Sequence, residues 1–172
     1  VDKQFLSATE LADGSFEIQY QVKVMNIGGT VGFYKVKDTP DFDNDVVIDS
    51  FRVDGTTTQG PIVLSSSNLA TPWELSPSVS LGPGLMDTYT VTVYARLVLD
   101  DNIGNETYDE CTSQNSPSPG FGLYNRAFVD INDDDDSNDP GEDTDDTCGE
   151  LPAVLDIEKS FVSANKEADD SF

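Results

Sequence analysis

Apolar and polar residues alternate along most of this chain, and that alternation constrains its fold more than any other feature. In residues 87–99 the odd-numbered positions from Tyr89 to Leu99 are apolar, whereas the even-numbered positions from Thr90 to Arg96 carry Thr, Tyr or Arg. Residues 16–24 alternate in the same way. A period of two is typical of a β-strand with one buried face.

Shorter apolar runs and turn signals extend this pattern to the rest of the chain. Asp54-Gly55 and Gly82-Pro83-Gly84 are turn signals between such runs, and helical periodicity is weak throughout. The sequence therefore predicts an all-β fold, an Ig-like Greek-key β-sandwich with long acidic loops. The further strands are expected at residues 31–37, 46–53, 62–64, 72–75 and 122–131.

The end of the chain repeats its beginning. Residues 157–172 match residues 1–16 at eight of sixteen positions, with an offset of 156 residues. A fixed internal period is typical of repeat proteins. We expect one repeat unit at residues 1–153, followed at 154–172 by a linker and the first strand of the next unit. That strand would pair within its own unit, or be donated to an exposed sheet edge of another subunit.

Charge excludes several classes of partner. The formal net charge is −24, with no histidine and nine basic residues. Such a surface repels nucleic acid and anionic membranes, so we expect neither as a partner. No run of 18 apolar residues is present, so this segment is not expected to insert into a membrane. Without histidine, a nucleophile motif or a cofactor loop, we expect no enzyme.

Two cysteines, Cys111 and Cys148, are the only ones in the chain. A single pair in an acidic chain rich in Asn, Thr and Gly predicts a disulfide formed in an oxidising compartment. The alternative is two free thiols, and a zinc site is disfavoured because there is no histidine to complete it.

Three polar residues share a strand face with core residues. Lys3 alternates with Val1 and Phe5, Asn125 with Leu123 and Ala127, and Asp38 with Tyr34 and Val36. A buried ammonium needs a partner, because burying it alone is costly. A lysine that recurs in the same place, as Lys159 in the second copy, strengthens the pattern.

Lysine, asparagine and a carboxylic acid together are the ingredients of an intramolecular isopeptide bond. Burial lowers the pKa of an amine and raises that of a carboxylic acid. The neutral amine of Lys3 could then attack the Asn125 carboxamide, while a protonated Asp38 polarises its carbonyl group and ammonia leaves. The alternative is that Lys3 extends its ammonium to solvent from an edge strand and Asn125 bonds to the backbone.

Acidic residues are concentrated in residues 130–146, where ten of seventeen positions are Asp or Glu. Excess hard oxygen ligands suit calcium, and the first positions follow the spacing of an EF-hand loop, although its glycine and its final glutamate are missing. The alternative is a solvated loop. The candidate calcium ligands are Asp130, Asn132, Asp134, Asp136 and Asp139, with Asp41, Asp43 and Asp45 as a second cluster.

A third acidic cluster follows residues 87–99 and contains Asp100, Asp101, Asn102 and Glu106. The same segment has a glycosylation pattern at Asn105.

Four segments, taken in order, resemble the conserved-repeat domain of prokaryotic surface proteins. They are FEIQYQVKVMNIG, VKDTP, WELSPSVSLGPGLMDTYTVTVYARL and LYNRAFV, and they fall within residues 1–129. The acidic insertion after Asp130 and the cysteine pair depart from that family's commonest pattern. The resemblance implies an Ig-like unit of a tandem array at the cell surface.

These observations favour a structural function. We expect a stalk or spacer module of a long extracellular adhesin or filament, with neighbouring repeats of the same chain as its partners. Calcium, the disulfide and the isopeptide bond would make it rigid. The alternative is an adhesin module that binds a glycan or a protein through its loops, although Trp73 and most tyrosines lie in strand-like runs and are expected in the core.

Overall fold

A computed structural model describes residues 1–99, 107–111 and 118–152 of the chain, and these residues form strands and loops only. The expected start of a second unit, at 154–172, lies outside them. The described part contains no helix that is long and apolar enough to cross a membrane. Its strands are β1 (Asp2–Glu10), β2 (Phe16–Met25), β3 (Gly32–Pro40), β4 (Val46–Thr57), β5 (Gly60–Ser66), β6 (Trp73–Glu74), β7 (Val79–Leu81), β8 (Met86–Leu97), β9 (Asn125–Asp130) and β10 (Asp143–Thr147).

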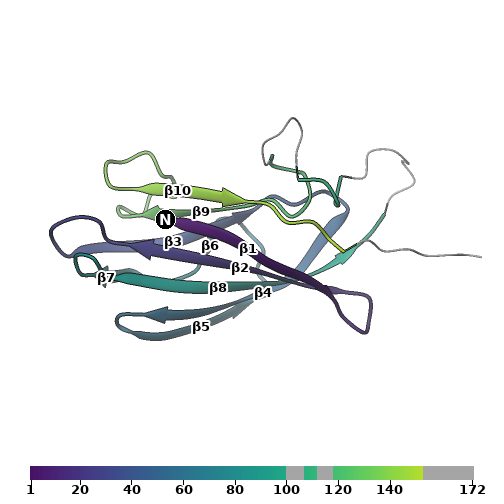
Figure 1. Cartoon of the computed structure of the whole chain (residues 1–172), viewed down its shortest axis with the longest axis horizontal. Helices are drawn as coiled ribbons and strands as arrows, with labels where there is room; N and C mark the ends of the chain where they lie inside the picture. The colour runs from purple at the N-terminus through teal and green to yellow at the C-terminus, as the bar shows by residue number, and fades with distance from the viewer. Residues whose placement is uncertain (100–106, 112–117, 153–172) are drawn as a thin grey trace, which may run out of the picture.

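The strands form two antiparallel sheets that pack face to face (Figure 1). One sheet has the order β1-β2-β8-β4-β5, and the other has the order β10-β9-β3-β6, with β7 also paired to β3. When β5, β6 and β7 are left out, the two sheets have the strand order of a constant-type immunoglobulin sandwich. The predicted all-β sandwich is therefore confirmed.

Alternation places one face of each central strand in the core. Along β2, the residues Phe16, Ile18, Tyr20 and Val22 are no more than 1% exposed, and the residues between them are half-buried. The core face of β8 is as predicted up to Ala95, whereas Leu99, beyond the strand, is 55% exposed. The core is completed by Trp73, whose ring stacks on Phe51 with centroids 4.0 Å apart.

Two local predictions are wrong. Asp54-Gly55 is not a turn, because β4 continues to Thr57 and pairs with β8 along this stretch. Gly55 instead makes room for the Tyr89 ring, since a Cβ there would lie 3.0 Å from its Cδ1. The acidic stretch expected as loop as far as Asp146 contains β10, whose acidic residues are tolerated because it is an edge strand beside β9.

The predicted disulfide joins Cys111 to Cys148, whose Cα atoms are 5.6 Å apart, within the usual range. It lies beside a tight backbone crossing at Gly122, whose φ of +49° favours glycine. A Cβ there would lie 2.8 Å from the carbonyl oxygen of Gly149. The bridge thus fastens the loop before β9 to the segment after β10.

Replacing both cysteines with alanine should lower the free energy of unfolding by roughly 3–4 kcal/mol, the chain-entropy value for a loop of this length. Urea denaturation of the parent chain and the C111A/C148A variant measures this difference. Reducing agent should destabilise the parent and leave the variant unchanged. Equal midpoints for parent and variant would contradict the prediction.

Candidate functional site

The first strand delivers a lysine to the inside of the sandwich. Lys3 is 4% exposed and lies opposite Val22 in the β1–β2 pair. Its Nζ is 5.0 Å from the centre of the Tyr20 ring, a cation–π distance. Its backbone N–H donates to Asp145 of β10 at 2.7 Å. The ammonium is therefore enclosed, and Lys3 does not reach solvent as the alternative required.

The structure brings Lys3, Asp38 and Asn125 together. Asp38 of β3 and Asn125, the first residue of β9, are fully buried. Lys3 Nζ donates to Oδ1 of Asp38, and Asn125 Nδ2 donates to Oδ2 of Asp38 at 2.9 Å. One carboxylate thus bridges an amine from the first sheet and a carboxamide from the second.

Register explains why the two residues of the second sheet meet. In the β3–β9 pair, Asp38 lies opposite Ala127 and Pro40 lies opposite Asn125. Asp38 and Asn125 are therefore diagonal neighbours on the same face, within reach of each other's side chains. Lys3 comes from the facing sheet, whose edge strand β1 lies against β10.

Burial lowers the pKa of Lys3, and the charge and hydrogen bond of Asp38 oppose that shift only in part. A lower pKa raises the fraction of neutral amine, which is the nucleophilic form. The side chain of Lys37, which lies two residues along β3 from Lys35, is also nearly buried, but its pKa shifts in the opposite direction. Although burial disfavours its charge, hydrogen bonds to Asp130, Asp135 and Asp133 raise the pKa of Lys37.

The carboxamide of Asn125 is oriented differently from the sequence-based expectation. Asp38 faces its nitrogen, not its carbonyl oxygen, and Oδ1 of Asn125 is a buried atom with no hydrogen-bond partner among the described residues. Asp38 is therefore placed to exchange protons with the amide nitrogen, the group that would leave. A buried carbonyl without a donor costs about 1–3 kcal/mol, so this carboxamide is held at the expense of stability.

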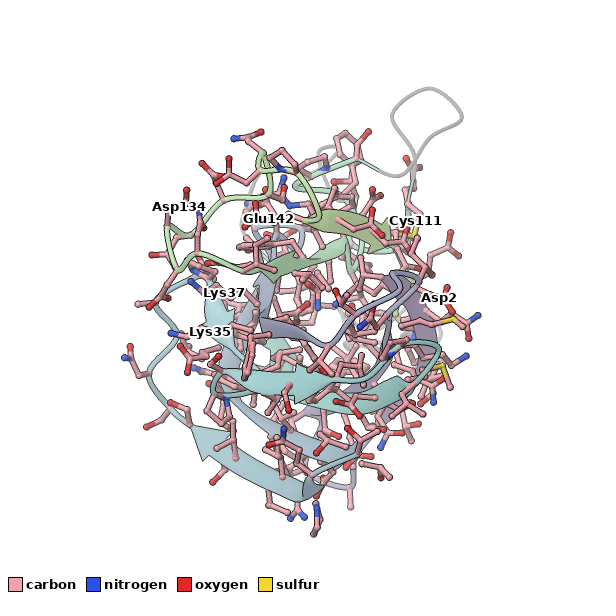
Figure 2. All side chains as sticks on the ribbon, turned by 90° about the vertical axis from the view of Figure 1, so that its left-hand side faces the viewer. Asp2, Lys35, Lys37, Cys111, Asp134 and Glu142 are labelled. Atoms are coloured by element: carbon pink, nitrogen blue, oxygen red, sulfur yellow. A yellow bond between two sulfur atoms is a disulfide. The ribbon has the colours of Figure 1, made fainter. Side chains whose placement is uncertain are left out.

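The acidic loop contains two groups of three carboxylates whose oxygens all lie within 4.8 Å of one another. One group is Asp130, Asp133 and Asp135, and the ammonium of Lys37 already bonds to all three. Figure 2 shows Lys35 and Lys37 close together beneath the loop that carries Asp134. The second group is Asp130, Asp134 and Glu142.

Glu142 is a candidate ligand that the sequence analysis missed, because it falls one position beyond the EF-hand spacing. Glu142 accepts from the backbone N–H groups of Ile131 and Asp139, and the expected ligands of this loop likewise serve its internal structure. Asn132 donates its side-chain nitrogen to Asp134 and Asp139, and Asp136 accepts from the backbone of Asn138 at 3.0 Å.

The second predicted calcium cluster does not assemble in the described part of the chain. Asp41, Asp43 and Asp45 form no group of three carboxylates there. Asp43 instead accepts from the backbone N–H of Asp45 at 2.9 Å and from the Thr107 hydroxyl, so it fastens its own loop. The cluster at Asp100, Asp101, Asn102 and Glu106 and the glycosylation pattern at Asn105 lie outside the described residues.

A second buried polar group, also missed, joins the sheets near the other end of β3. The Tyr34 hydroxyl donates to Asp87 at 2.7 Å and lies 2.8 Å from the Tyr89 hydroxyl. Asp87 also accepts from the backbone N–H of Thr58 at 2.6 Å. Asp87 shares the parity of the core residues of β8, which is the signal that could have identified it. With its bonds satisfied, this group is structural.

Comparison of the chain with protein-family models, with curated proteins and with solved structures finds no match. The resemblance to the conserved-repeat domain therefore stays a prediction. The buried group of Lys3, Asp38 and Asn125 is then the feature of the chain that points most directly to a function.

Lys37 is held as a cation in an environment opposite to that of Lys3, and the contribution of Lys37 to stability can be tested by varying the pH. Replacing Lys37 with methionine should destabilise the chain by about 3 kcal/mol at pH 7, because it leaves Asp130 buried without its cation. Burial alone would raise the pKa of Asp130, but Lys37 and the backbone N–H groups of Asp133 and Asp135 lower it. The carboxylate's contribution is therefore complete above the usual aspartate value of 3.8 and is lost as the pH falls through the lowered value.

The difference between the K37M variant and the parent should accordingly shrink below pH 3.8. Urea denaturation at a series of pH values measures it. Lys35→Met is the matched control, because Lys35 pairs only with exposed carboxylates. A K37M penalty that stays constant into acid would contradict the prediction.

Proposed function

We propose that this chain is a load-bearing repeat unit of an extracellular surface protein, in which Lys3 and Asn125 join to form an isopeptide bond. The observation that carries the proposal is the carboxylate of Asp38, buried and bonded to both reacting nitrogens. Proximity and proton transfer are what such a reaction needs from the protein. It occurs once, without turnover, so the unit is not an enzyme.

The steps balance with Asp38 as the only proton carrier. Asp38 takes a proton from the Lys3 ammonium, and the amine attacks Cγ of Asn125. Asp38 passes its proton to Nδ2 and takes a second one from Nζ. The Cγ–Nδ2 bond breaks, ammonia leaves, and an amide joins Nζ to Cγ. Nζ loses two protons in all, one carried away in ammonia and one retained by Asp38.

The position of this bond suits a unit pulled from both ends. Val1 lies at one end of the sandwich, and the last described residues lie toward the other (Figure 1). Tension applied at Val1 would pass through the Lys3 side chain to Asn125, and residues 4–124 would carry none. By the chain-entropy arithmetic used for disulfides, closing that loop also stabilises the fold by about 4–5 kcal/mol. The disulfide supports the extracellular placement.

Intact-mass spectrometry of the purified, reduced and unfolded chain tests the bond. The mass should fall short of the sequence mass by one ammonia, and proteolysis should release a peptide pair joined through Lys3 and Asn125. Lys3→Met, Asp38→Asn and Asn125→Ala should each restore the full mass, because each removes a reactant or the proton carrier.

Lys37→Met is the matched control and should keep the mass deficit, since it removes a nearly buried lysine that remains charged. A parent chain at full sequence mass after weeks of storage would contradict the bond. A deficit that persists in N125A would place the lost ammonia elsewhere.

Calcium binding at the acidic loop is the second part of the proposal. Asp130, Asp134 and Glu142 bring three carboxylates together, and a calcium ion between them would relieve the repulsion of their like charges. Repulsion by neighbouring acids also acts at Asp139, where burial, followed by Glu142 and Asp134, raises the pKa. A calcium ion there would fix the loop at the end of the unit where Val1 lies.

Thermal unfolding with and without calcium measures this. Calcium at one hundred times its dissociation constant should stabilise the chain by about 2.7 kcal/mol. D134N/E142Q should lose the response, whereas E10Q/E17Q, which removes the same charge from β1 and β2, should keep it. An equal response in both variants would indicate general screening of charge and contradict a site.

A further inference from the structure

One end of the sandwich leaves an apolar groove open. The groove has a volume of about 860 Å³, and its walls come from the ends of β2 and β9, the starts of β3 and β8, and the loops between them. Ile27 and Phe33 are the most exposed of its apolar side chains, at 91% and 67%. An apolar surface of this kind on a chain of net charge −24 indicates a docking site.

Exposed apolar residues of the described chain gather at its two ends. Seven of the thirteen large ones lie around the groove, and three lie at the opposite end. Around the groove they are Met25, Ile27, Val31, Phe33, Leu85, Met86 and Ile131. At the opposite end they are Val47, at the start of β4, and Val98 and Leu99, beyond the end of β8.

The repeat determines what lies next to the groove. Val1 and Asp2 line it, so any chain that precedes Val1 emerges at its rim. Ile157 matches Val1 in the second copy. Between Pro152, the last described residue, and Ile157 there are five peptide steps, which span at most about 17 Å. In a tandem array, the end of one unit therefore lies close to the groove of the next.

We propose that this groove is the seat of the preceding copy of the same unit, and that the apolar residues at that copy's far end fill it. Val47 and Val98 suit this role because the β4–β8 pairing of Val46 with Leu97 places them at the same edge. The inference rests on the proposed function, since it requires a tandem array. It makes the joint between units stiff, where a short free linker alone would leave it flexible.

Acidic residues on both sides of this joint repel one another, and this repulsion makes the joint sensitive to salt. The rim of the groove includes Glu142 and Asp143, and the far end of the unit carries the exposed acidic residue Asp41, whereas Asp49 nearby is paired with Arg96. Salt does not weaken apolar contact, but it screens the repulsion between exposed acids, which falls off within a Debye length of about 8 Å at physiological ionic strength. The joint should therefore be tighter at physiological than at low salt.

A two-unit protein, residues 1–156 followed directly by residues 1–172, tests the proposal. Small-angle X-ray scattering at physiological salt should show one narrow distribution of the distance between units. Replacing Ile27 and Phe33 with serine in the second unit should broaden that distribution, because its groove receives the first unit. The same two substitutions in the first unit, whose groove has no unit before it, should change nothing.

Three outcomes would overturn the inference. The parent could scatter as two freely linked units, the two variants could behave alike, or the single chain could dimerise in sedimentation and lose the dimer in I27S/F33S. The last result would assign the groove to side-by-side copies. The intact mass of the same two-unit protein, short by two ammonia molecules, reports the proposed function separately, so failure of the joint and failure of the cross-link are distinguishable.

Discussion

The fold depends on how it accommodates a buried ammonium between two sheets. Lys3 of the first sheet reaches Asp38 of the second, and Asp38 also holds Asn125. Removing any one partner would leave a buried charge or amide unsatisfied, which is far more costly than losing a surface ion pair. The same contact helps to fix β1, an edge strand that pairs with β2 on one side and donates the Lys3 N–H to Asp145 of β10 on the other, against the rest of the sandwich.

Two lysines show that environment, not residue type, decides what an amine can do. Lys3 has one carboxylate partner and an aromatic wall, and burial lowers its pKa. Lys37 has three carboxylate partners beside a loop open to water, and its pKa is raised. The amine of Lys3 is therefore the one that the proposed reaction would use, whereas Lys37 is held as a cation. A buried lysine near a carboxylate is therefore not enough to predict an isopeptide bond. The number of carboxylates around the amine and the presence of an acyl group also matter.

Strand parity predicted the buried site because Lys3, Asp38 and Asn125 keep the period of two of their strands, and the register shift in β1 comes only after Phe5. Lys3, Asp38 and Asn125 were identifiable as polar residues on core faces, and the sheets bring those faces together. Parity could not give the orientation of the Asn125 carboxamide, which depends on a hydrogen bond across the sheet. Composition alone was misleading for β10. Its acidic residues predict a loop, but an edge strand needs no apolar face and can carry them. Glu142 joins the carboxylates through the path of the loop, which spacing alone does not encode.

Load and stiffness would make separate demands on a repeat unit, and the proposed cross-link and the proposed joint lie in different places. Resistance to pulling would require a covalent path that avoids the hydrogen bonds of β1, and the proposed bond between Lys3 and Asn125 would provide one. Stiffness along an array requires contact between units, and no bond inside one unit can provide it. In the proposed array, the apolar residues left exposed at both ends would supply that contact. If units dock end to end as proposed, an isolated unit exposes apolar surface that the array would bury.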